Sequence, residues 1–355
     1  MEKPHVAEPT GEQQPAENTR QPVWKAMSEV TPKAGKPARM IDRQQKNGGI
    51  IPDNIGPNGI VGENRQGQWW GGFYGWTGLY SHQMMGSAIT VAAEAAHLVT
   101  GDAKYLRLLR THLDLLIEHA VEKDGRLLVP HRHTDDGWTD FAQMQPQPPI
   151  HLWSASMTAE DRHRLERLRQ GDAEGWSAVE SRGPRSLDDR AWTRFLAGDL
   201  PDYPELILQA NYREVRRRLD AVLGDDQDLT TMDVHHWQQV NPVITEALVQ
   251  LTTGGPQTVY WGGLAQGRVR YFDPRSRRPG LPPDVAALVR RLDGDSVELT
   301  LVNLSVSATR EVILGAGSFG EHRFTSAAID GASDGPDAAF DDGYLQVCLP
   351  FVLQR

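Results

Sequence analysis

The hydrophobic period of this chain changes from helical to alternating at Gly254-Gly255-Pro256, and this change constrains its fold more than any other feature. Before it, segments such as AKYLRLLRTHLDLLIEHAVE repeat apolar residues every three or four positions, as amphipathic helices do. After it, runs such as GRVRYFD, SVELTLVNL, REVILG and YLQVCLP alternate between apolar and polar residues, as strands do. Because helices come first and strands last, the sequence predicts an α+β fold, with an N-terminal α-helical region followed by an antiparallel β-sandwich.

Three regions follow from this division. Residues 1–45 are rich in Pro, Gln, Glu and Lys, so we expect a disordered or extended N-terminal segment. Residues 46–255 predict a helical domain with long functional loops, and residues 256–355 predict the β-sandwich.

Some elements are predicted in detail. Thr100-Gly101-Asp102 predicts the turn of a helical hairpin, and MTAEDRHRLERLRQ predicts a helix capped by its threonine. Residues 124–153 predict a long loop with one short strand, Arg126–Pro130, and Pro242 predicts the first turn of a helix. Among the later strands, PPDVAALVRRL predicts a short helix or turn, whereas HRFTSAA predicts a strand.

Composition excludes several classes of partner. A net charge of −10 argues against a nucleic-acid partner, because that binding depends on lysine and arginine neutralising phosphates. No run of eighteen apolar residues occurs, so we expect no membrane partner. The N-terminal residues have no apolar stretch typical of a signal peptide, which predicts either a cytoplasmic protein or a truncated gene start that hides such a peptide.

The stretch from Pro52 to His82 combines carboxylates, aromatic rings and glycines in a way that a helix or strand of the core does not need. Glycine lets the backbone approach a ligand closely, and indole and phenol rings form flat amphipathic platforms. Such a mixture is typical of a sugar-binding cleft, although the same aromatics could simply pack on the domain below. The candidate substrate-binding residues of this stretch are Trp69, Trp70, Tyr74, Trp76 and His82.

Two further polar and aromatic segments precede or join helices, at residues 130–153 and 225–241. In an antiparallel helical array every second loop lies on the same rim, so we expect these loops to converge with the first on one cleft. They add the candidate substrate-binding residues His131, His133, Trp138 and Trp237.

Glycoside hydrolysis needs two carboxyl groups, one protonated as the acid and one ionised as the base or nucleophile. Glu63 is the candidate acid, because nearby tryptophans could desolvate it and raise its pKa. Asp53, or Asp140 in the second loop, is the candidate base.

β-Elimination on a uronic acid has other requirements, namely a group that neutralises the substrate carboxylate and a His or Tyr that removes the C5 proton. The third loop supplies these groups as His235, His236 and Asn241. Both chemistries therefore stay open.

No cofactor is expected, because the chain has no P-loop and no dinucleotide-binding fingerprint. A metal site built from His131, His133 and Asp135 or Asp136 is conceivable, but such spacings are common in loops that bind no metal, and we predict none.

The combination of WWGGFYGW on a loop, NPVITEALVQLTTGGP and a following β-sandwich resembles the (α/α)-toroid carbohydrate-active proteins, both six-hairpin glycosidases and toroid polysaccharide lyases. The resemblance is one of architecture and composition, and it implies a cleft in the helical part. A full toroid needs about twelve helices, whereas the helical patterns here predict about six or seven. The chain is therefore expected to be a partial toroid, or part of a longer one.

The sequence thus predicts a carbohydrate-active enzyme that cleaves glycosidic bonds, with a hydrolase favoured over a lyase. A non-catalytic or truncated glycan-binding protein is the alternative from a different class. The expected partner in either case is a carbohydrate.

Overall fold

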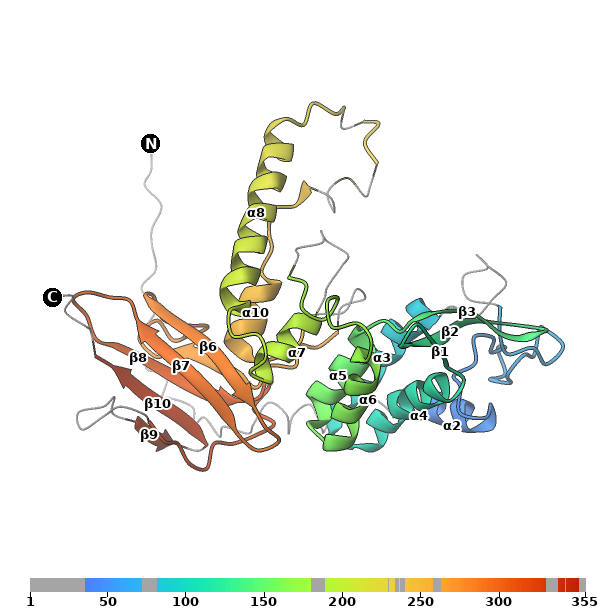
Figure 1. The fold of residues 1–355 in the computed structure, drawn as a ribbon. Coiled ribbons are helices and arrows are strands. Elements are labelled where there is room, and N and C mark those ends of the chain that lie inside the picture. Colours follow the sequence, from blue (N-terminus) through green and yellow to red (C-terminus); the bar gives the residue numbers. More distant parts are fainter. Residues whose placement is uncertain are drawn as a thin grey trace, which may run out of the picture.

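The computed structural model of the protein describes residues 36–71, 82–179, 189–228, 230–233, 236, 240–257, 263–329, 338–341 and 343–350. Within them helices come first and the larger sheet last, so the predicted α+β class is confirmed (Figure 1). The helices are α2 (Lys36–Lys46), α3 (His82–Thr100), α4 (Lys104–Glu118), α5 (Gln147–Ser156), α6 (Ala159–Arg169), α7 (Arg190–Leu196), α8 (Tyr203–Leu223) and α10 (Glu246–Thr253). The strands are β1 (Val121–Lys123), β2 (Arg126–Thr134), β3 (Gly137–Gln143), β4 (Val269–Asp273), β5 (Arg278–Pro279), β6 (Val285–Leu292), β7 (Val297–Asn303), β8 (Arg310–Ala316), β9 (Ala338–Asp341) and β10 (Tyr344–Leu349).

Helices α3 and α4 form the predicted hairpin. Gly101 ends α3 in the left-handed conformation (φ 69°), and the Asp102 carboxylate accepts a hydrogen bond of 2.9 Å from the backbone N–H of Lys104. The predicted apolar stripe of α4 is buried, since its members are at most 3% exposed: Tyr105, Leu109, His112, Leu113 and Leu116. Among the described residues, no helix offers a stretch that is both long and apolar enough to cross a bilayer.

Helix α2 corrects the prediction that residues 1–45 are disordered or extended. The chain is helical from Lys36 onward, and Met40 and Ile41 pack against the core formed by α3 and α4. The Gln44 amide donates a buried hydrogen bond of 2.8 Å to the Leu108 carbonyl. The helix is amphipathic, but its apolar residues are few, and a segment so rich in Lys, Arg and Gln has the composition of a disordered tail.

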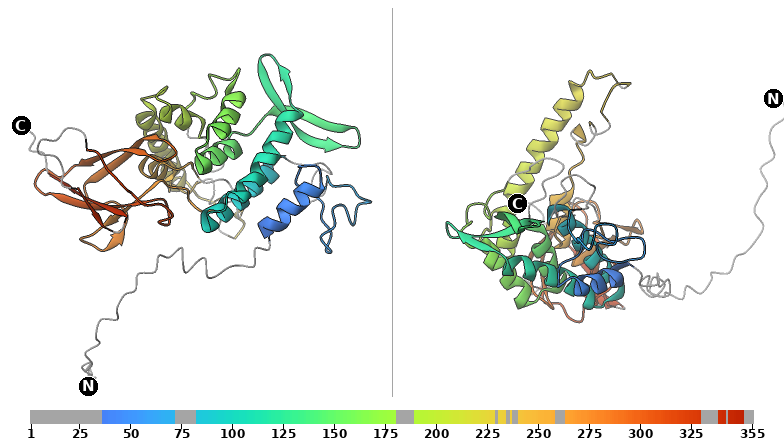
Figure 2. Two further views of the ribbon diagram at one scale, coloured as in Figure 1. Left: turned by 90° about the horizontal axis from the view of Figure 1, so that it is seen from below. Right: turned by 90° about the vertical axis from the view of Figure 1, so that its right-hand side faces the viewer.

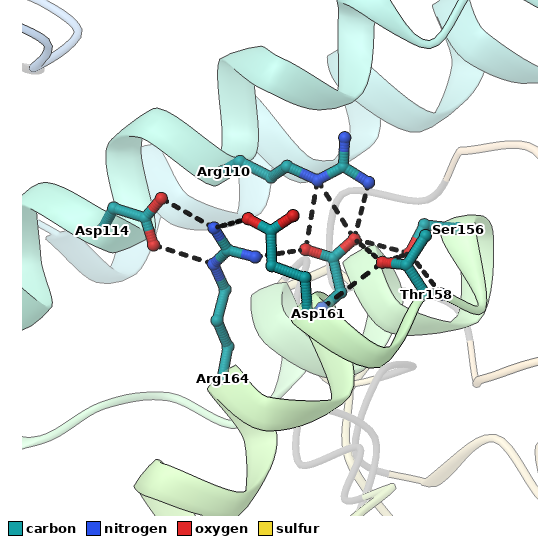
Figure 3. Close-up of polar contacts among 7 residues, drawn as sticks. Arg110, Asp114, Ser156, Thr158, Asp161 and Arg164 are labelled. Atoms are coloured by element: carbon teal, nitrogen blue, oxygen red, sulfur yellow. Dashed lines mark hydrogen bonds and ion pairs between the residues drawn. The ribbon is translucent and has the colours of Figure 1, made fainter.

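An ion-pair network joins α4 to α6 (Figure 3). The Asp161 carboxylate, fully buried, accepts hydrogen bonds from Arg110 and Arg164, each with a shortest distance of 2.7 Å. Arg164 also binds both oxygens of Asp114, at 2.8 and 2.7 Å. The predicted cap at Thr158 is confirmed, because its side chain accepts the Asp161 N–H.

Residues 121–143 form a three-stranded antiparallel sheet. The predicted strand Arg126–Pro130 is confirmed as the first part of β2, whereas the long loop predicted around it is wrong. Strands β2 and β3 pair from Leu128↔Gln143 to Thr134↔Gly137, and Gly137 (φ 100°) closes the turn between them. The pattern is easily missed because both faces of this hairpin carry polar and aromatic residues. Its strands therefore lack the alternation that a half-buried strand shows.

The C-terminal part is a five-stranded sheet in the order β5-β4-β8-β10-β9, with the hairpin β6–β7 packed against it. Two predictions in this part are wrong, since PPDVAALVRRL contains strand β6 and residues 322–328 contain no strand. Val285, Val289 and Leu292 of β6 are buried, and a bulge between Val289 and Arg291 changes the spacing. The resulting intervals of four and three residues imitate a helix.

The core of the sandwich continues into the helices. Trp153, Trp192 and Leu251 share one buried cluster with Val269 and Val312 of the sheet. A second cluster holds α2, α3, α4 and β2 together.

Helix α8 stands out from the body of the molecule (Figures 1 and 2). It ends at Leu223, before Gly224. Residues 240–245 return beside it, where Arg218 Nη1 donates a 2.7 Å hydrogen bond to the Asn241 carbonyl. The helix predicted to begin at Pro242 begins instead at Glu246.

Candidate functional site

The first candidate loop closes on itself over residues 52–71. The backbone N–H groups of Asp53 and Asn54 both donate to the Trp69 carbonyl, at 2.8 and 3.0 Å. The Asn54 amide donates to the carbonyls of Gln68 (3.2 Å) and Trp70 (2.5 Å). These bonds fix the two tryptophans relative to the start of the loop.

Two glycines allow the loop to fold this tightly. A Cβ on Gly62 (φ 67°) would lie 2.3 Å from the backbone of Gly67, and a Cβ on Gly56 would lie 2.1 Å from the Glu63 carboxylate. That carboxylate accepts hydrogen bonds from the backbone N–H (3.0 Å) and the side-chain amide of Asn58. Glu63 therefore holds the turn of its own loop together.

Four rings from the loop and the β2–β3 hairpin meet in what we call the aromatic cluster: Trp69, Trp70, His133 and Trp138. The His133 ring centroid lies 4.8 Å from that of Trp69, 4.6 Å from that of Trp70 and 4.8 Å from that of Trp138. Trp69 and Trp138 are 5.7 Å apart, and His119, after α4, adds a ring 5.3 Å from Trp138. The four members of the cluster are each partly exposed.

The neutral form of His133 is favoured at the centre of this cluster, because its pKa is lowered. Burial lowers its pKa, the nearby His119 lowers it further, and Asp135 only partly offsets these effects. Its Nδ1 is buried and has no hydrogen-bond partner among the described residues. The pKa of His131, two residues earlier, is also lowered by burial, and its Nε2 lies 3.1 Å from the Gln143 carbonyl oxygen.

The candidate carboxylates have different surroundings. Asp53 is tied to the aromatic cluster through its backbone bond to Trp69. Asp140, in the left-handed conformation (φ 55°), forms an exposed ion pair of 2.9 Å with Arg132. Of the three, Asp53 is the carboxylate joined most directly to the rings.

The third loop does not reach the aromatic cluster. Figures 1 and 2 place the described parts of residues 225–241 beside and beyond the far end of α8, away from the β2–β3 hairpin. There His236 Nε2 lies 2.5 Å from Asp225 Oδ2, and Asn241 Oδ1 accepts the Val243 N–H. The expected convergence of three loops is thus found for two of them within the described residues.

Several candidates lie outside the described residues: Tyr74, Trp76, His235 and Trp237. His82 is the first residue of α3, and its side chain is likewise outside them. In the part of the chain that is described, no three His, Cys, Asp or Glu side chains are grouped to hold a metal ion.

A buried polar network was not predicted from the sequence. His151 Nδ1 lies 2.9 Å from Glu94, and its Nε2 lies 2.9 Å from the Gln257 carbonyl oxygen and 3.9 Å from Asp189. Asp189 in turn accepts hydrogen bonds from the Gln250 amide (2.5 Å) and the Gln257 N–H (2.9 Å). The network joins α3, α5 and α10 to the segment leading into the sheet.

This network keeps a charged histidine inside the protein. Burial alone lowers the pKa of His151, but Glu94 and Asp189 outweigh it and raise the pKa above its usual value. All these side chains are at most 9% exposed, so the network is structural rather than open to a substrate. The one local sequence signal of this network is Asp189, which immediately precedes a helix and therefore predicts only a helix cap.

Comparison with known proteins gives a family without an assigned activity. The model of a family described as a domain of unknown function, DUF8034, matches residues 39–127 and 123–249. These residues include the loop and the hairpin that form the aromatic cluster. No curated protein and no solved structure matches the chain.

Proposed function

This chain belongs to the DUF8034 family, whose function is unknown, and we propose from the geometry of its aromatic cluster that it binds glycans. The proposal rests on one observation. Three tryptophans from two segments, the 52–71 loop and the β2–β3 hairpin, gather around His133 and stay partly exposed. Indole rings offer flat apolar faces to the C–H faces of a sugar, while their edges stay polar.

The exposure of these rings separates them from the packing tryptophans of the same chain. Trp153, Trp176 and Trp192 serve the core and are only 1–4% exposed. The rings of the aromatic cluster lie at the surface of a small hairpin and on a loop that is held by its own hydrogen bonds. Trp138 also packs against the core of α3 and α4, so the exposed parts of the rings are the surface offered to a sugar.

Polar groups around the rings could take up sugar hydroxyls. His119 is exposed beside Trp138, so its ring nitrogens can exchange hydrogen bonds with a sugar. Asp135, whose charge acts on His133, is exposed at the turn of the same hairpin. A glycan-binding site combines such a stacking surface with a few polar groups that fix orientation.

Cleavage of a glycosidic bond is the second candidate, and Asp53 supports it. Its backbone N–H donates to the Trp69 carbonyl, so it is the candidate carboxylate whose residue is bonded to a residue of the cluster. The acid role proposed for Glu63 is weaker, since that carboxylate is engaged with Asn58. For a lyase, His236 and Asn241 lie beside α8, too far away to act on a sugar that is bound to the rings. Among the residues that the structure describes, His133 is then the candidate base, since its lowered pKa favours the neutral form.

Calorimetric titration with a panel of neutral and acidic oligosaccharides tests binding. Trp69→Ala and Trp138→Ala should each weaken affinity by about tenfold, the loss of one stacking contact. Trp138→Phe should keep most of the affinity, because a ring remains. Phe340→Ala removes an exposed ring from the distant strand β9 and should change nothing. Lack of binding to every glycan, or equal loss in the Phe340 variant, would contradict the proposal.

Cleavage is tested separately with the glycans that bind. Release of reducing ends that is lost in Asp53→Asn supports a hydrolase. A product absorbing near 235 nm, lost in His133→Gln, supports a lyase. Binding without either product leaves a glycan-binding protein.

A further inference from the structure

Helix α8 carries an apolar stripe that no described residue covers. We call it the α8 seam: Leu208, Tyr212, Val215, Leu219 and Val222. Four of these side chains are 39–62% exposed, and Val215 is partly exposed. The intervals between them are four, three, four and three residues. This is the spacing of the core positions of a coiled coil.

The seam is not the surface that attaches α8 to the protein. That role belongs to a different face, on which Tyr203, Ile207 and Ala210 are buried. Farther along the same face, Glu214 bonds to Arg218 at 2.7 Å. Since this attachment is complete without the seam, α8 has a second, unused packing face.

We propose that the α8 seam binds the α8 seam of a second copy of this chain, with the two helices antiparallel. The occupant must be a helix, because heptad spacing places its side chains into the holes of a facing helix. A second copy supplies that partner with the same spacing by symmetry.

The area of the seam fits a small homodimer interface. Leu223, 85% exposed at the end of the helix, extends the seam. If each large side chain has about 150–250 Å² of surface, the exposed fractions of the seam and Leu223 together give roughly 400–600 Å² of exposed surface on each copy. A symmetric pair therefore buries about 1,000 Å², near the lower limit for a specific interface. We expect a dimer that dissociates on dilution.

The charges beside the seam favour the antiparallel arrangement. Arg216 and Asp220 lie four residues apart on one flank, and the Arg216 guanidinium lies over the Tyr212 ring, 5.9 Å from its centroid. When one helix is reversed, this flank faces its own copy, and Arg216 of each chain comes within one turn of Asp220 of the other. In a parallel pair the flank would face Asn211 and Arg218 instead, and the acid between them, Glu214, is buried and already paired with Arg217 and Arg218.

Sedimentation velocity of the full chain over a wide concentration range tests the dimer. The wild type should shift from monomer to dimer, and Leu219→Arg should weaken dimerisation by more than tenfold. Leu304→Arg is the matched control, since Leu304 is 63% exposed on the sandwich and should leave the dimer unchanged. A wild type that is monomeric at about 100 µM would overturn the proposal, as would a Leu219→Arg variant that dimerises normally.

Cysteine cross-linking tests the orientation. In a Cys348→Ser background, which removes the native cysteine, the double change Tyr212→Cys/Val222→Cys should form a covalent dimer on oxidation. Tyr212→Cys alone should not, because residue 212 faces residue 222 of the other chain. Efficient cross-linking of Tyr212→Cys alone would indicate a parallel pair and overturn the antiparallel assignment. Circular dichroism of each variant checks that α8 remains folded.

Discussion

Replacing Asp161 by asparagine should destabilise the protein by about 3 kcal/mol. The carboxylate is fully buried and accepts hydrogen bonds from Arg110, Arg164 and Ser156. Removing one partner of a buried ion pair typically costs 3–5 kcal/mol, because the other charge stays buried without compensation. We place the cost at about 3 kcal/mol because Arg164 keeps its bonds to Asp114 and Arg110 is partly exposed.

The loss should depend on pH in a defined direction. Burial opposes ionisation of Asp161, but the hydrogen bonds from Arg110 and Ser156 outweigh it and hold the pKa below its usual value. A carboxyl group with a depressed folded-state pKa adds stability above its unfolded pKa of about 4. That stability disappears as the pH falls through the folded pKa. The gap between wild type and variant should therefore narrow below about pH 4.

Urea denaturation followed by circular dichroism measures both effects, at pH 7 and at pH 3. Asp42→Asn is the matched control, because Asp42 pairs with Lys46 on the surface and both side chains are more than half exposed. It should cost less than about 0.5 kcal/mol. A loss below about 1 kcal/mol for the Asp161 variant, or a loss unchanged at pH 3, would refute this account of the network.

Three further outcomes are expected. Because the folded-state pKa of His151 is raised, its ion pairs stabilise the protein fully below the unfolded-state pKa of about 6.5. This stabilisation is lost as the pH rises through the folded-state pKa. His151→Gln should therefore remove this part of the pH dependence of the free energy of unfolding. Gly62→Ala should disrupt the loop of the aromatic cluster, because its Cβ would overlap the Gly67 backbone, and near-ultraviolet dichroism of the tryptophans should fall. Gly67 also has a positive φ (87°), but a Cβ there would have no neighbour within 4 Å, so Gly67→Ala should cost only about 1 kcal/mol of strain and keep the signal. Asp53→Asn should leave glycan binding within about threefold of wild type, since the backbone bond to Trp69 remains.

Local signals in the sequence were strong enough to predict the elements that obey a single period. The stripe of α4 and the cap at Thr158 are as predicted, because each depends on residues within one or two turns. The sequence also identified Trp69, Trp70, His133 and Trp138 as site candidates. These four rings meet only because the loop at 52–71 lies beside the β2–β3 hairpin. The expected alternation of loops in a helical array favoured such a contact, but it did not specify which residues would touch.

The errors have physical causes. Strand β6 was hidden by its bulge, which gives helical spacing to Val285, Val289 and Leu292. The β2–β3 hairpin was hidden because neither of its faces is uniformly apolar. The network of Glu94, His151 and Asp189 joins residues far apart in the chain, and no local pattern marks such contacts.

The most direct test of glycan binding is a nitrogen-15 NMR titration that follows the indole N–H signals. A bound glycan should shift the signals of Trp69, Trp70 and Trp138, because a sugar on these rings changes their environment. The signals of Trp153, Trp176 and Trp192 should stay in place, because those rings are buried in the core. Shifts confined to the first group are what the account predicts. Shifts in the core group alone, or none with any glycan, would contradict it.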